Sequence, residues 1–489
     1  MNTDRSVALA TLLRRLPAAT VQGDLDRTVT AIVADSRAAR TGALFVALPG
    51  SVEDGHRYVP GAIAGGARSI VVEASFAAAT PPDVAVVRVA DTRRALSALA
   101  AAFYGDPSHA LDVIGVTGTN GKTTVTRMVA AILNEAAIPC GTIGTVGAAF
   151  GLQTWRLENT TPLPPELHAL LARMRDEGAR AVAMEVSSHA LALGRVEDVR
   201  FRAAVLTNVT RDHLDFHQTV DAYAAAKRRL LSLAPTIVIN ADDEYGERWA
   251  VEASDEGREV IAYGNRDGAT LAPADIVLQS HGSQFTLGGQ RYTLPIPGRF
   301  NIWNALGAIG AARCLGVEDA VIARGLAALN PIPGRMERVG SGDVEVVVDY
   351  AHTPDALESA LRSLRETAGG ALVVVFGCGG DRDKGKRAEM GAVAARLADR
   401  LYITSDNSRS EEPRAIVDAI LAGVGAREHV VELDRRRAIE RAISQARPGD
   451  VVLVAGKGHE DYQIVGTRVL PFDDAAISRE ALAARTVLR

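Results

Sequence analysis

Short apolar runs separated by polar turns recur along the whole chain and predict a protein of the α/β class. In the first part of the chain, the runs at 29–33, 43–47, 69–72 and 84–89 predict strands, and a helix-like stretch ends near Tyr104. Pro107 disfavours continuation of that helix, so we place a domain boundary there. Residues 1–107 are therefore expected to form a small N-terminal α/β domain.

The middle of the chain, residues 108–333, alternates strand-like and helix-like segments as expected for a parallel sheet with crossover helices. The runs at 181–186, 203–206 and 236–239 predict strands, and polar residues follow each one. Ligands bind at the carboxyl ends of strands in open parallel sheets, so we expect the chemistry there. Glycine-rich β-like patches at 261–294 are expected to be peripheral.

The proline-rich stretch 331–335 predicts a hinge, and residues 334–489 form the third predicted domain. This domain also alternates, which predicts a C-terminal parallel, Rossmann-like α/β domain. Its predicted strands are 344–349, 372–376, 401–404 and 451–455, and its helices include 356–365 and 387–397. Polar, glycine-rich segments follow all four strands, which favours a ligand site over separate solvated turns.

Length and composition restrict the class of protein. A chain of 489 residues exceeds one ordinary core, and 47% hydrophobic with 23% charged residues is typical of folded domains. A net charge of -5 argues against a general nucleic-acid or membrane-surface binder. The cysteines at 140, 314 and 378 lack metal-site spacing and fit a reducing compartment. Without a membrane-length apolar run or a signal-like N-terminus, we expect a cytoplasmic protein.

The stretch 117–124, Thr-Gly-Thr-Asn-Gly-Lys-Thr-Thr, predicts a phosphate-binding loop between a strand and a helix. Gly118 and Gly121 allow backbone N–H groups to approach phosphate oxygens, Lys122 can reach the terminal phosphates, and Thr123 can ligate magnesium. The strict Walker pattern fails by one residue, because Val116 stands where its first glycine should be. A plain glycine turn is the less favoured alternative.

Other polar residues have both a functional and a structural interpretation. Glu185, at the end of a predicted strand, is well placed to hold magnesium. A histidine such as His213 is more often a surface or hydrogen-bonded residue than a ligand, and Lys227 lies on what looks like a solvated basic helix. Asp35 is expected to cap a helix or turn, and Asn301 either caps a helix or contacts a nucleotide.

Together these motifs resemble those of the Mur ligases, ATP-dependent amide-forming enzymes of peptidoglycan precursor synthesis. Within the family, the chain is most similar to members that add the third peptide residue to UDP-N-acetylmuramoyl-L-alanyl-D-glutamate. The resemblance covers essentially the whole chain, and its most specific pieces are 117–124, 185–189, 212–215, 349–354 and 456–460. It implies UDP-sugar, ATP and amino-acid binding by the N-terminal, central and C-terminal domains, in cell-wall biogenesis, cell shape and cell division.

The resemblance also implies a role for each matching residue. ATP would be bound by Gly118, Thr119, Asn120, Gly121, Lys122, Thr123, Thr124, Asn301, Arg335 and His352. Magnesium would be held by Thr123, Glu185, His213 and a carbamylated Lys227, and the catalytic residues would be Lys122, Lys227, His213 and Glu185. The UDP-muramoyl dipeptide would contact Ser36, Thr160, Thr161, Ser187 and Arg195. The family reaction passes through an acyl phosphate, which an incoming amine then attacks.

The amino acid that is added is a finer question. Family members that use meso-diaminopimelate carry Asp-Asn-Pro-Arg, whose arginine binds the distal carboxylate, and this chain has Asp-Asn-Ser-Arg at 406–409. L-Lysine lacks that carboxylate and would leave Arg409 unpaired. We therefore expect meso-diaminopimelate as the substrate. The matching residues are Arg382, Asp406, Asn407, Arg409, Gly456 and Glu460.

Three alternatives stay open at this point: a lysine-adding ligase, a folylpolyglutamate synthetase-like ligase, and a nucleotide-binding module without ligase activity. The extra N-terminal domain disfavours the second. The third is disfavoured because Lys122, Glu185 and Lys227 are all present. We expect a monomer with small-molecule substrates, magnesium as cofactor, and no nucleic-acid partner or membrane span.

Overall fold

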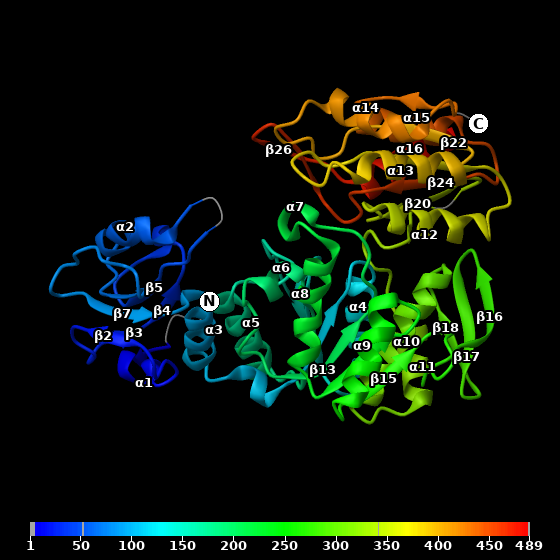
Figure 1. The fold of residues 1–489 in the computed structure, drawn as a ribbon. Coiled ribbons are helices and arrows are strands. Elements are labelled where there is room, and N and C mark those ends of the chain that lie inside the picture. The colour runs from blue at the N-terminus through cyan, green and yellow to red at the C-terminus, as the bar shows by residue number, and fades with distance from the viewer. Residues whose placement is uncertain (1–4, 51–52, 341, 488–489) are drawn as a thin grey trace. The chain divides into compact units, whose positions relative to one another are not determined.

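The computed structural model describes residues 5–50, 53–340 and 342–487. Figure 1 shows the fold coloured along the chain, with many of its elements labelled. The chain divides into two compact units. The first comprises 1–115, 138–204 and 226–235, and the second comprises 116–137, 205–225 and 236–489.

The N-terminal region is built on a five-stranded sheet in which β2 (Thr20–Gln22) is antiparallel to its neighbour and the other pairs are parallel. The order continues with β7 (Ala85–Val89), β6 (Ser69–Glu73), β5 (Ala43–Val46) and β4 (Ala31–Val33). Alternate side chains of β5 enter two different cores: Leu44 and Val46 join one, and Phe45 joins the other. The helices here are α1 (Leu9–Leu13), α2 (Val59–Ala64) and α3 (Thr92–Phe103), with 3₁₀ turns η1 (Ser36–Ala38), η2 (Gly55–Tyr58) and η3 (Pro107–Ala110).

The predicted strand at 29–33 is instead two strands. Val29 belongs to β3 (Thr28–Val29), which pairs with β1 (Val7–Ala8), whereas β4 pairs with β5. Between them, the Thr30 N–H donates to the carbonyl of Gly42. The run therefore switches sheets at Thr30, the one polar residue within it. The other predicted strands and the helix of this region are confirmed.

The central sheet has eight strands. Their order is β11 (Gln153–Trp155), β10 (Gly147–Phe150), β9 (Cys140–Gly144), β12 (Ala181–Glu185), β8 (Asp112–Thr117), β13 (Phe201–Leu206), β14 (Thr236–Asn240) and β15 (Glu259–Tyr263). The three strands predicted after the phosphate loop are confirmed as β12, β13 and β14. The segment predicted to be peripheral contains a separate antiparallel sheet of β16 (Ala274–Gln279), β17 (Gly282–Leu287) and β18 (Gln290–Leu294).

Eight helices belong to this central part of the described chain. They are α4 (Lys122–Glu135), α5 (Pro164–Asp176), α6 (Ser188–Ala192), α7 (Leu214–His217), α8 (Val220–Ser232), α9 (Glu244–Asp255), α10 (Arg299–Arg313) and α11 (Asp319–Ala327). The most buried is α10, whose residues from Ala305 to Ala312 are fully buried, because small residues let neighbouring elements approach closely.

The C-terminal sheet has six strands, of which only β19 (Glu337–Arg338) is antiparallel to its neighbour. The order continues with β20 (Glu345–Asp349), β24 (Val451–Ala455), β21 (Leu372–Phe376), β22 (Arg400–Ile403) and β23 (Val430–Val431). One face packs on α12 (Pro354–Arg365), α13 (Lys386–Leu397) and α14 (Pro413–Val424). The other packs on α15 (Arg435–Gln445) and α16 (Asp474–Val487). A hairpin of β25 (Tyr462–Val465) and β26 (Arg468–Pro471) follows β24, and the predicted parallel α/β domain is confirmed.

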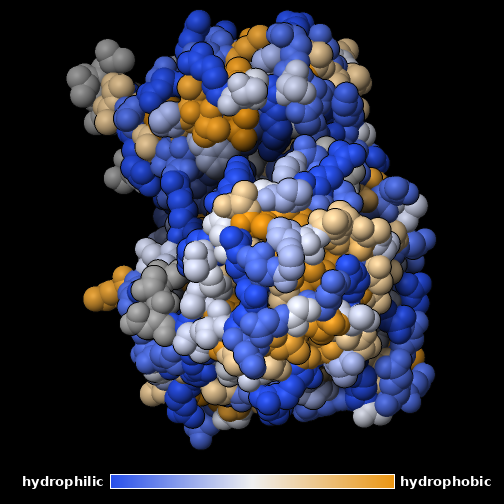
Figure 2. Space-filling view, turned by 90° about the vertical axis from the view of Figure 1, so that its left-hand side faces the viewer, coloured by the Kyte–Doolittle hydropathy of each residue, from blue (hydrophilic) through white to orange (hydrophobic). Residues whose placement is uncertain are grey.

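On the face shown in Figure 2, hydrophobic residues form separate patches among hydrophilic ones. No helix among the described residues is both long and apolar enough to cross a membrane.

Candidate active site

The predicted phosphate loop lies where the sequence placed it, between the end of β8 at Thr117 and the start of α4 at Lys122. The Lys122 ammonium donates to the carbonyl oxygens of Gly118 and Thr119, at 3.0 and 2.9 Å. The lysine therefore curls over its own loop, at the N-terminal end of a helix that favours anions.

Both glycines of this loop are required by packing. Gly121 has φ +89° and a Cβ there would overlap Asn304 Oδ1, while a Cβ on Gly118 would overlap Thr207 Oγ1. The Asn120 N–H donates to Asn208 Oδ1 at 2.9 Å, and Thr207 Oγ1 donates to the Asn120 carbonyl at 2.5 Å. The glycines thus bring the loop against the segment after β13 without a side chain between them.

Asn301 does not cap α10, because the cap position is Gly298 and Asn301 lies in the first turn. Its side chain is buried, donates to the carbonyl of Pro297 at 2.7 Å, and accepts from Asn304 Nδ2 at 3.0 Å. Asn304, to which the sequence analysis gave no role, is thereby fixed beside Gly121. Two asparagines three residues apart on an otherwise apolar helix were the available signal.

The hinge arginine reaches the start of α4. Arg335 Nη2 donates to Thr123 Oγ1 at 3.0 Å, and its guanidinium lies 4.6 Å from the centre of the Tyr350 ring. The structure thus brings together two residues that are 212 positions apart in the chain. Arg335 therefore lies beside the predicted phosphate loop, and its contact with the phosphates of ATP stays a prediction.

Asp212 joins two histidines that the sequence analysis treated separately. Its buried carboxylate lies 3.3 Å from His213 Nε2 and 3.8 Å from His352 Nε2, and His352 Nδ1 lies 2.8 Å from the carbonyl of Tyr350. Burial alone would raise the pKa of Asp212, but the neighbouring His352 and His213 lower the pKa far below its usual range. Asp212 therefore orients both rings while it stays ionised.

In the first unit, Glu185 is the centre of a polar group at the end of β12. Its carboxylate accepts from the Thr145 N–H at 2.8 Å and from Thr145 Oγ1 at 3.0 Å, and Thr145 Oγ1 lies 3.1 Å from Thr160 Oγ1. Thr161 Oγ1 donates to the Glu185 carbonyl at 2.9 Å, and the Ser187 N–H donates to Thr161 Oγ1 at 3.0 Å. No motif in the sequence indicated that Thr145 belongs to this group.

Two of the residues predicted to contact the UDP-muramoyl dipeptide also stabilise the local structure. Arg195 Nη1 donates to the Thr161 carbonyl at 2.8 Å, and Ser187 Oγ caps α6 by accepting from the Ala190 N–H. Ser36 is separate from this group: it begins η1 and is partly exposed. Asp35 caps that turn by accepting from the Arg37 N–H, which confirms the predicted cap.

The expectation of a solvated surface for Lys227 is wrong. The side chain is 1% exposed on α8, whereas the adjacent Arg228 and Arg229 are exposed. The helical period turns Lys227 to the same buried side as Tyr223 and Leu230. A buried lysine requires a compensating partner or a chemical change, because an isolated ammonium is costly to remove from water.

In the second unit, the structure gathers most of the residues predicted to bind the amino acid into what we call the C-terminal corner: Asp406, Asn407, Arg409, Gly456 and Glu460. Asn407 Nδ2 donates to Glu460 Oε2 at 2.8 Å, and the Asn407 N–H donates to Asp406 Oδ1 at 2.5 Å. A Cβ on Gly456 would lie 2.9 Å from Asp406 Oδ2. Burial opposes ionisation of Asp406, but the charges of Arg435 and Lys457 lower the pKa of its carboxyl.

Arg409 has a left-handed backbone with φ +51°. The hairpin fixes this conformation, because the Arg409 N–H donates to the Ile464 carbonyl at 3.2 Å and the Gly466 N–H donates to the Arg409 carbonyl at 2.8 Å. Arg409 Nη1 donates to the Gly380 carbonyl at 2.8 Å. Arg382 is exposed and bonds to the carbonyl of Asp381, and both arginines flank Gly379.

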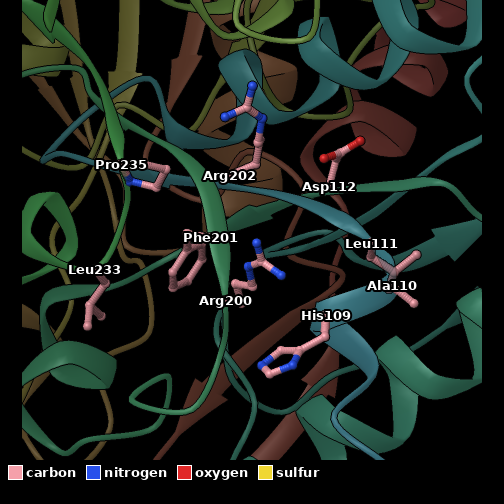
Figure 3. A pocket seen from close by; sticks show the side chains of 9 residues that line it. All are labelled: His109, Ala110, Leu111, Asp112, Arg200, Phe201, Arg202, Leu233 and Pro235. Carbon is pink, nitrogen blue, oxygen red and sulfur yellow. The ribbon is translucent and has the colours of Figure 1, made fainter. Parts of the chain in front are cut away.

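A cavity of about 420 Å³ lies away from these groups. Figure 3 shows its lining, which includes the basic residues Arg200, Arg202 and His109 and the acidic Asp112. Asp112 begins β8 and Arg200 precedes β13, so this cavity lies at the amino ends of those strands. The phosphate loop follows the carboxyl end of β8, where ligands of such sheets bind.

Three protein-family models match the chain in order. They are "Mur ligase family, catalytic domain" at 28–104, "Mur ligase middle domain" at 116–312, and "Mur ligase, glutamate ligase domain" at 334–458. Their order agrees with the predicted N-terminal, central and C-terminal domains, although the boundaries at 107 and 333 stay predictions.

Similar proteins extend this match over the whole chain. UDP-N-acetylmuramoyl-L-alanyl-D-glutamate--2,6-diaminopimelate ligase of Gloeobacter violaceus is 45% identical and covers 94% of this chain and 95% of its own. The protein of the same name from Geobacillus kaustophilus is 42% identical, with coverage of 98% and 99%.

Solved structures give the same result for the fold. A structure of a UDP-N-acetylmuramoyl-L-alanyl-D-glutamate--2,6-diaminopimelate ligase has a TM-score of 0.68 at 30% identity, covering 97% of this chain and 99% of its own. MurF from Acinetobacter baumannii has a TM-score of 0.67 at 20% identity, with 99% of both chains covered, and shows likeness of fold alone. The chain thus has the three-domain α/β fold that its sequence predicted, and it belongs to the Mur ligase family.

Proposed function

We propose that this protein is an ATP-dependent ligase that adds meso-diaminopimelate to UDP-N-acetylmuramoyl-L-alanyl-D-glutamate in peptidoglycan precursor synthesis. Relatives named as the corresponding 2,6-diaminopimelate ligase, at 41–46% identity over nearly the whole chain, support this proposal. The observation that carries it is the chain of contacts in the C-terminal corner, where Arg409 bonds to the Asn407 carbonyl and the Asn407 side chain bonds to Glu460.

The corner offers complementary groups for an amino acid with charged groups at both ends. Arg409 supplies a guanidinium for a carboxylate, and Glu460 supplies a carboxylate for an ammonium. Diaminopimelate carries both groups at its distal end, whereas L-lysine carries only the ammonium there. Lysine would leave Arg409 unpaired in a partly buried site, and an unpaired charge is a strong basis for rejection.

The phosphate loop supplies the other half of the reaction. The carboxylate of the dipeptide attacks the γ-phosphate of ATP and displaces ADP, which gives an acyl phosphate. The amine then attacks the acyl carbon, loses a proton and displaces phosphate. Lys122 moves from the carbonyls of its own loop to the phosphates, and Arg335 approaches them from the hinge. These cations offset the repulsion between two anions in the first step.

We assign magnesium, the hard cation of the family, to Thr123, Glu185, His213 and a carbamylated Lys227. Three of these groups offer oxygen, the donor that magnesium prefers. Among the described residues there is no cluster of three or more acidic, histidine or cysteine side chains that could hold a metal. Magnesium is usually bound through one or two carboxylates together with phosphates and water. Bound magnesium supplies charge neutralisation at the phosphates.

Further parts of the proposal rest on the resemblance. Ser36, Thr160, Thr161, Ser187 and Arg195 bind the UDP-muramoyl dipeptide; Asn301 and His352 bind the adenosine side of ATP. The domain boundaries lie near 107 and 333, and the enzyme is a cytoplasmic monomer.

The test is phosphate release from ATP with magnesium and UDP-N-acetylmuramoyl-L-alanyl-D-glutamate, comparing meso-diaminopimelate with L-lysine. Wild type is expected to turn over with diaminopimelate alone. In Arg409→Ala, kcat/KM for diaminopimelate should fall by about 100-fold, because a charge-assisted bidentate contact is lost. Arg414→Ala is the matched control, since Arg414 is a 58% exposed arginine of the same domain that pairs with Asp418.

Turnover with lysine would support the ligase activity and contradict the proposed specificity for diaminopimelate. No turnover with either amine, under conditions in which ATP binds, would favour another member of the superfamily or a binding role. Equal activity of Arg409→Ala and Arg414→Ala would contradict the proposal that Arg409 binds the amino acid.

A further inference from the structure

Lys457 is a buried cation beside the C-terminal corner to which neither the sequence nor the proposed reaction assigns a task. It follows Gly456 after β24, and its side chain is 0% exposed. Its ammonium donates to Glu460 Oε2 at 3.0 Å and to Asn407 Oδ1 at 3.2 Å, and lies 5.4 Å from the centre of the Tyr462 ring. A buried ammonium is tolerated only with such partners.

These contacts orient the two oxygens of Glu460 differently. Oε2 accepts from both Lys457 and Asn407, whereas Oε1 has a long contact of 3.4 Å with the Tyr350 hydroxyl. The Glu460 side chain is 16% exposed, so part of it is accessible to a ligand. Oε2 therefore anchors the carboxylate, and Oε1 is the oxygen that can accept from a ligand ammonium.

The same lysine fixes the amide of Asn407. Asn407 Oδ1 accepts from Lys457 and from the Ile464 N–H at 2.9 Å, while Nδ2 donates to Glu460. The amide cannot flip without losing these bonds. Asn407 lies two residues before Arg409. Lys457 therefore connects Glu460, which is available to a ligand ammonium, with the segment that carries Arg409.

A purely structural role is already filled by another buried pair. Arg435 and Asp474, both 0% exposed, form an ion pair at 2.7 Å, and Arg435 donates to the carbonyls of Ala455 and Ser405 at the ends of β24 and β22. The strand ends therefore have their own support. The polar contacts of Lys457 go to Asn407 and Glu460, which belong to the C-terminal corner.

We propose that Lys457 is a positioning residue for the amino-acid substrate, which sets the carboxylate of Glu460 to receive the distal ammonium of diaminopimelate. The inference rests on the proposed function. Lys457 does not touch the substrate: it acts through Glu460 and Asn407.

The experiment compares wild type, Lys457→Met, Glu460→Gln and the double variant in the phosphate-release assay. Two amines are used: meso-diaminopimelate, and 2-aminopimelate, which keeps both carboxylates and lacks the distal ammonium. Lys457→Met is expected to raise KM for diaminopimelate by roughly 10- to 100-fold, with KM for ATP within about twofold of wild type. The double variant should be no worse than the worse single variant, because both changes remove one interaction.

The selective readout is the second amine. With 2-aminopimelate, Lys457→Met should change KM by less than about threefold, because that substrate makes no ammonium contact to lose. Lys384→Met, which alters a lysine of the same domain with 71% side-chain exposure, is the control and should match wild type with both amines. Lys457→Arg, which keeps the charge with a different geometry, should shift KM for diaminopimelate in the same direction by less.

Each outcome decides the inference. No wild-type turnover with diaminopimelate overturns the proposed function and the role of Lys457 with it. Normal wild-type turnover together with equal KM changes for both amines, or with additive effects in the double variant, overturns the positioning role alone. If Lys457→Met does not fold, Lys457→Arg and Glu460→Gln carry the same comparison between the two amines.

Discussion

The phosphate loop and the C-terminal corner are both built at strand ends, but different forces hold them. In the loop, Gly118 and Gly121 let backbone groups lie against Thr207 and Asn304, and no side chain would fit between. In the corner, Arg409 keeps a left-handed backbone because a hairpin and the amide of Asn407 surround it. The loop depends on the absence of side chains at its two glycines. The corner depends on side chains that converge from separate segments.

The difference also separates shared chemistry from selective chemistry. A loop that binds phosphate through its backbone needs little beyond its own residues and the helix that follows. The corner that we propose distinguishes one amine from another has polar side chains at fixed positions. They come from 406–409 and 456–460 and are braced by β25. Substitutions should therefore disable the loop abruptly and the corner by degrees.

The largest expected effect on activity is in the loop, in Gly121→Ala. The new Cβ would overlap Asn304, and alanine would have to adopt the left-handed backbone of Gly121. For both reasons kcat/KM for ATP should fall by about 100-fold or more. Gly178→Ala is the control, because Gly178 has a similar φ of +98° with no atom within 4 Å of the added Cβ. An active Gly121→Ala enzyme would show that the loop tolerates side chains as the corner does.

The next effect is on the support of the corner, in Asp474→Asn. Removing one partner of the buried Arg435 pair should cost about 3–5 kcal/mol of unfolding free energy, measured by urea denaturation. Asp418→Asn, in an exposed pair with Arg414, should cost less than about 1 kcal/mol. Equal costs would mean that the buried pair does not brace the strand ends.

Acid should weaken the surroundings of the corner through Glu411. The hydrogen bond with Arg387 holds the pKa of Glu411 at about 2, below its ordinary 4.5. The resulting stabilisation is complete above pH 4.5 and is lost as the pH falls towards 2. Melting temperatures across this range should show a smaller acid-induced drop in Glu411→Gln than in wild type, whereas the exposed neighbour Glu412→Gln should behave as wild type. Identical profiles for all three proteins would contradict this assignment.

The smallest effect is expected for Ser408→Pro, which restores the residue of the related Asp-Asn-Pro-Arg sequences. Among the described residues, the buried Ser408 N–H has no hydrogen-bond partner, so proline removes no bond. The free energy of unfolding should rise by up to about 1 kcal/mol, because proline lowers the conformational entropy of the unfolded chain. The preference for diaminopimelate over lysine should be unchanged. A large change in preference would show that the hairpin does not replace the restraint that proline supplies.

By itself the sequence determined the class of fold, the phosphate loop and the candidate residues at the strand ends. These follow from local patterns: apolar periodicity for strands and helices, and glycine, lysine and threonine spacing between β8 and α4. It also predicted that the polar ends of the C-terminal strands belong together, because parallel strands present their carboxyl ends at one edge.

Only the tertiary structure decided the rest. It buried Lys227, placed Asn301 within α10 rather than at its cap, and divided the apolar run at Thr30 between two sheets. It also set Arg335 against Thr123 and enclosed Lys457 between Asn407 and Glu460. These outcomes depend on contacts between residues far apart in the chain, and a local pattern carries no information about which distant side chain will meet it.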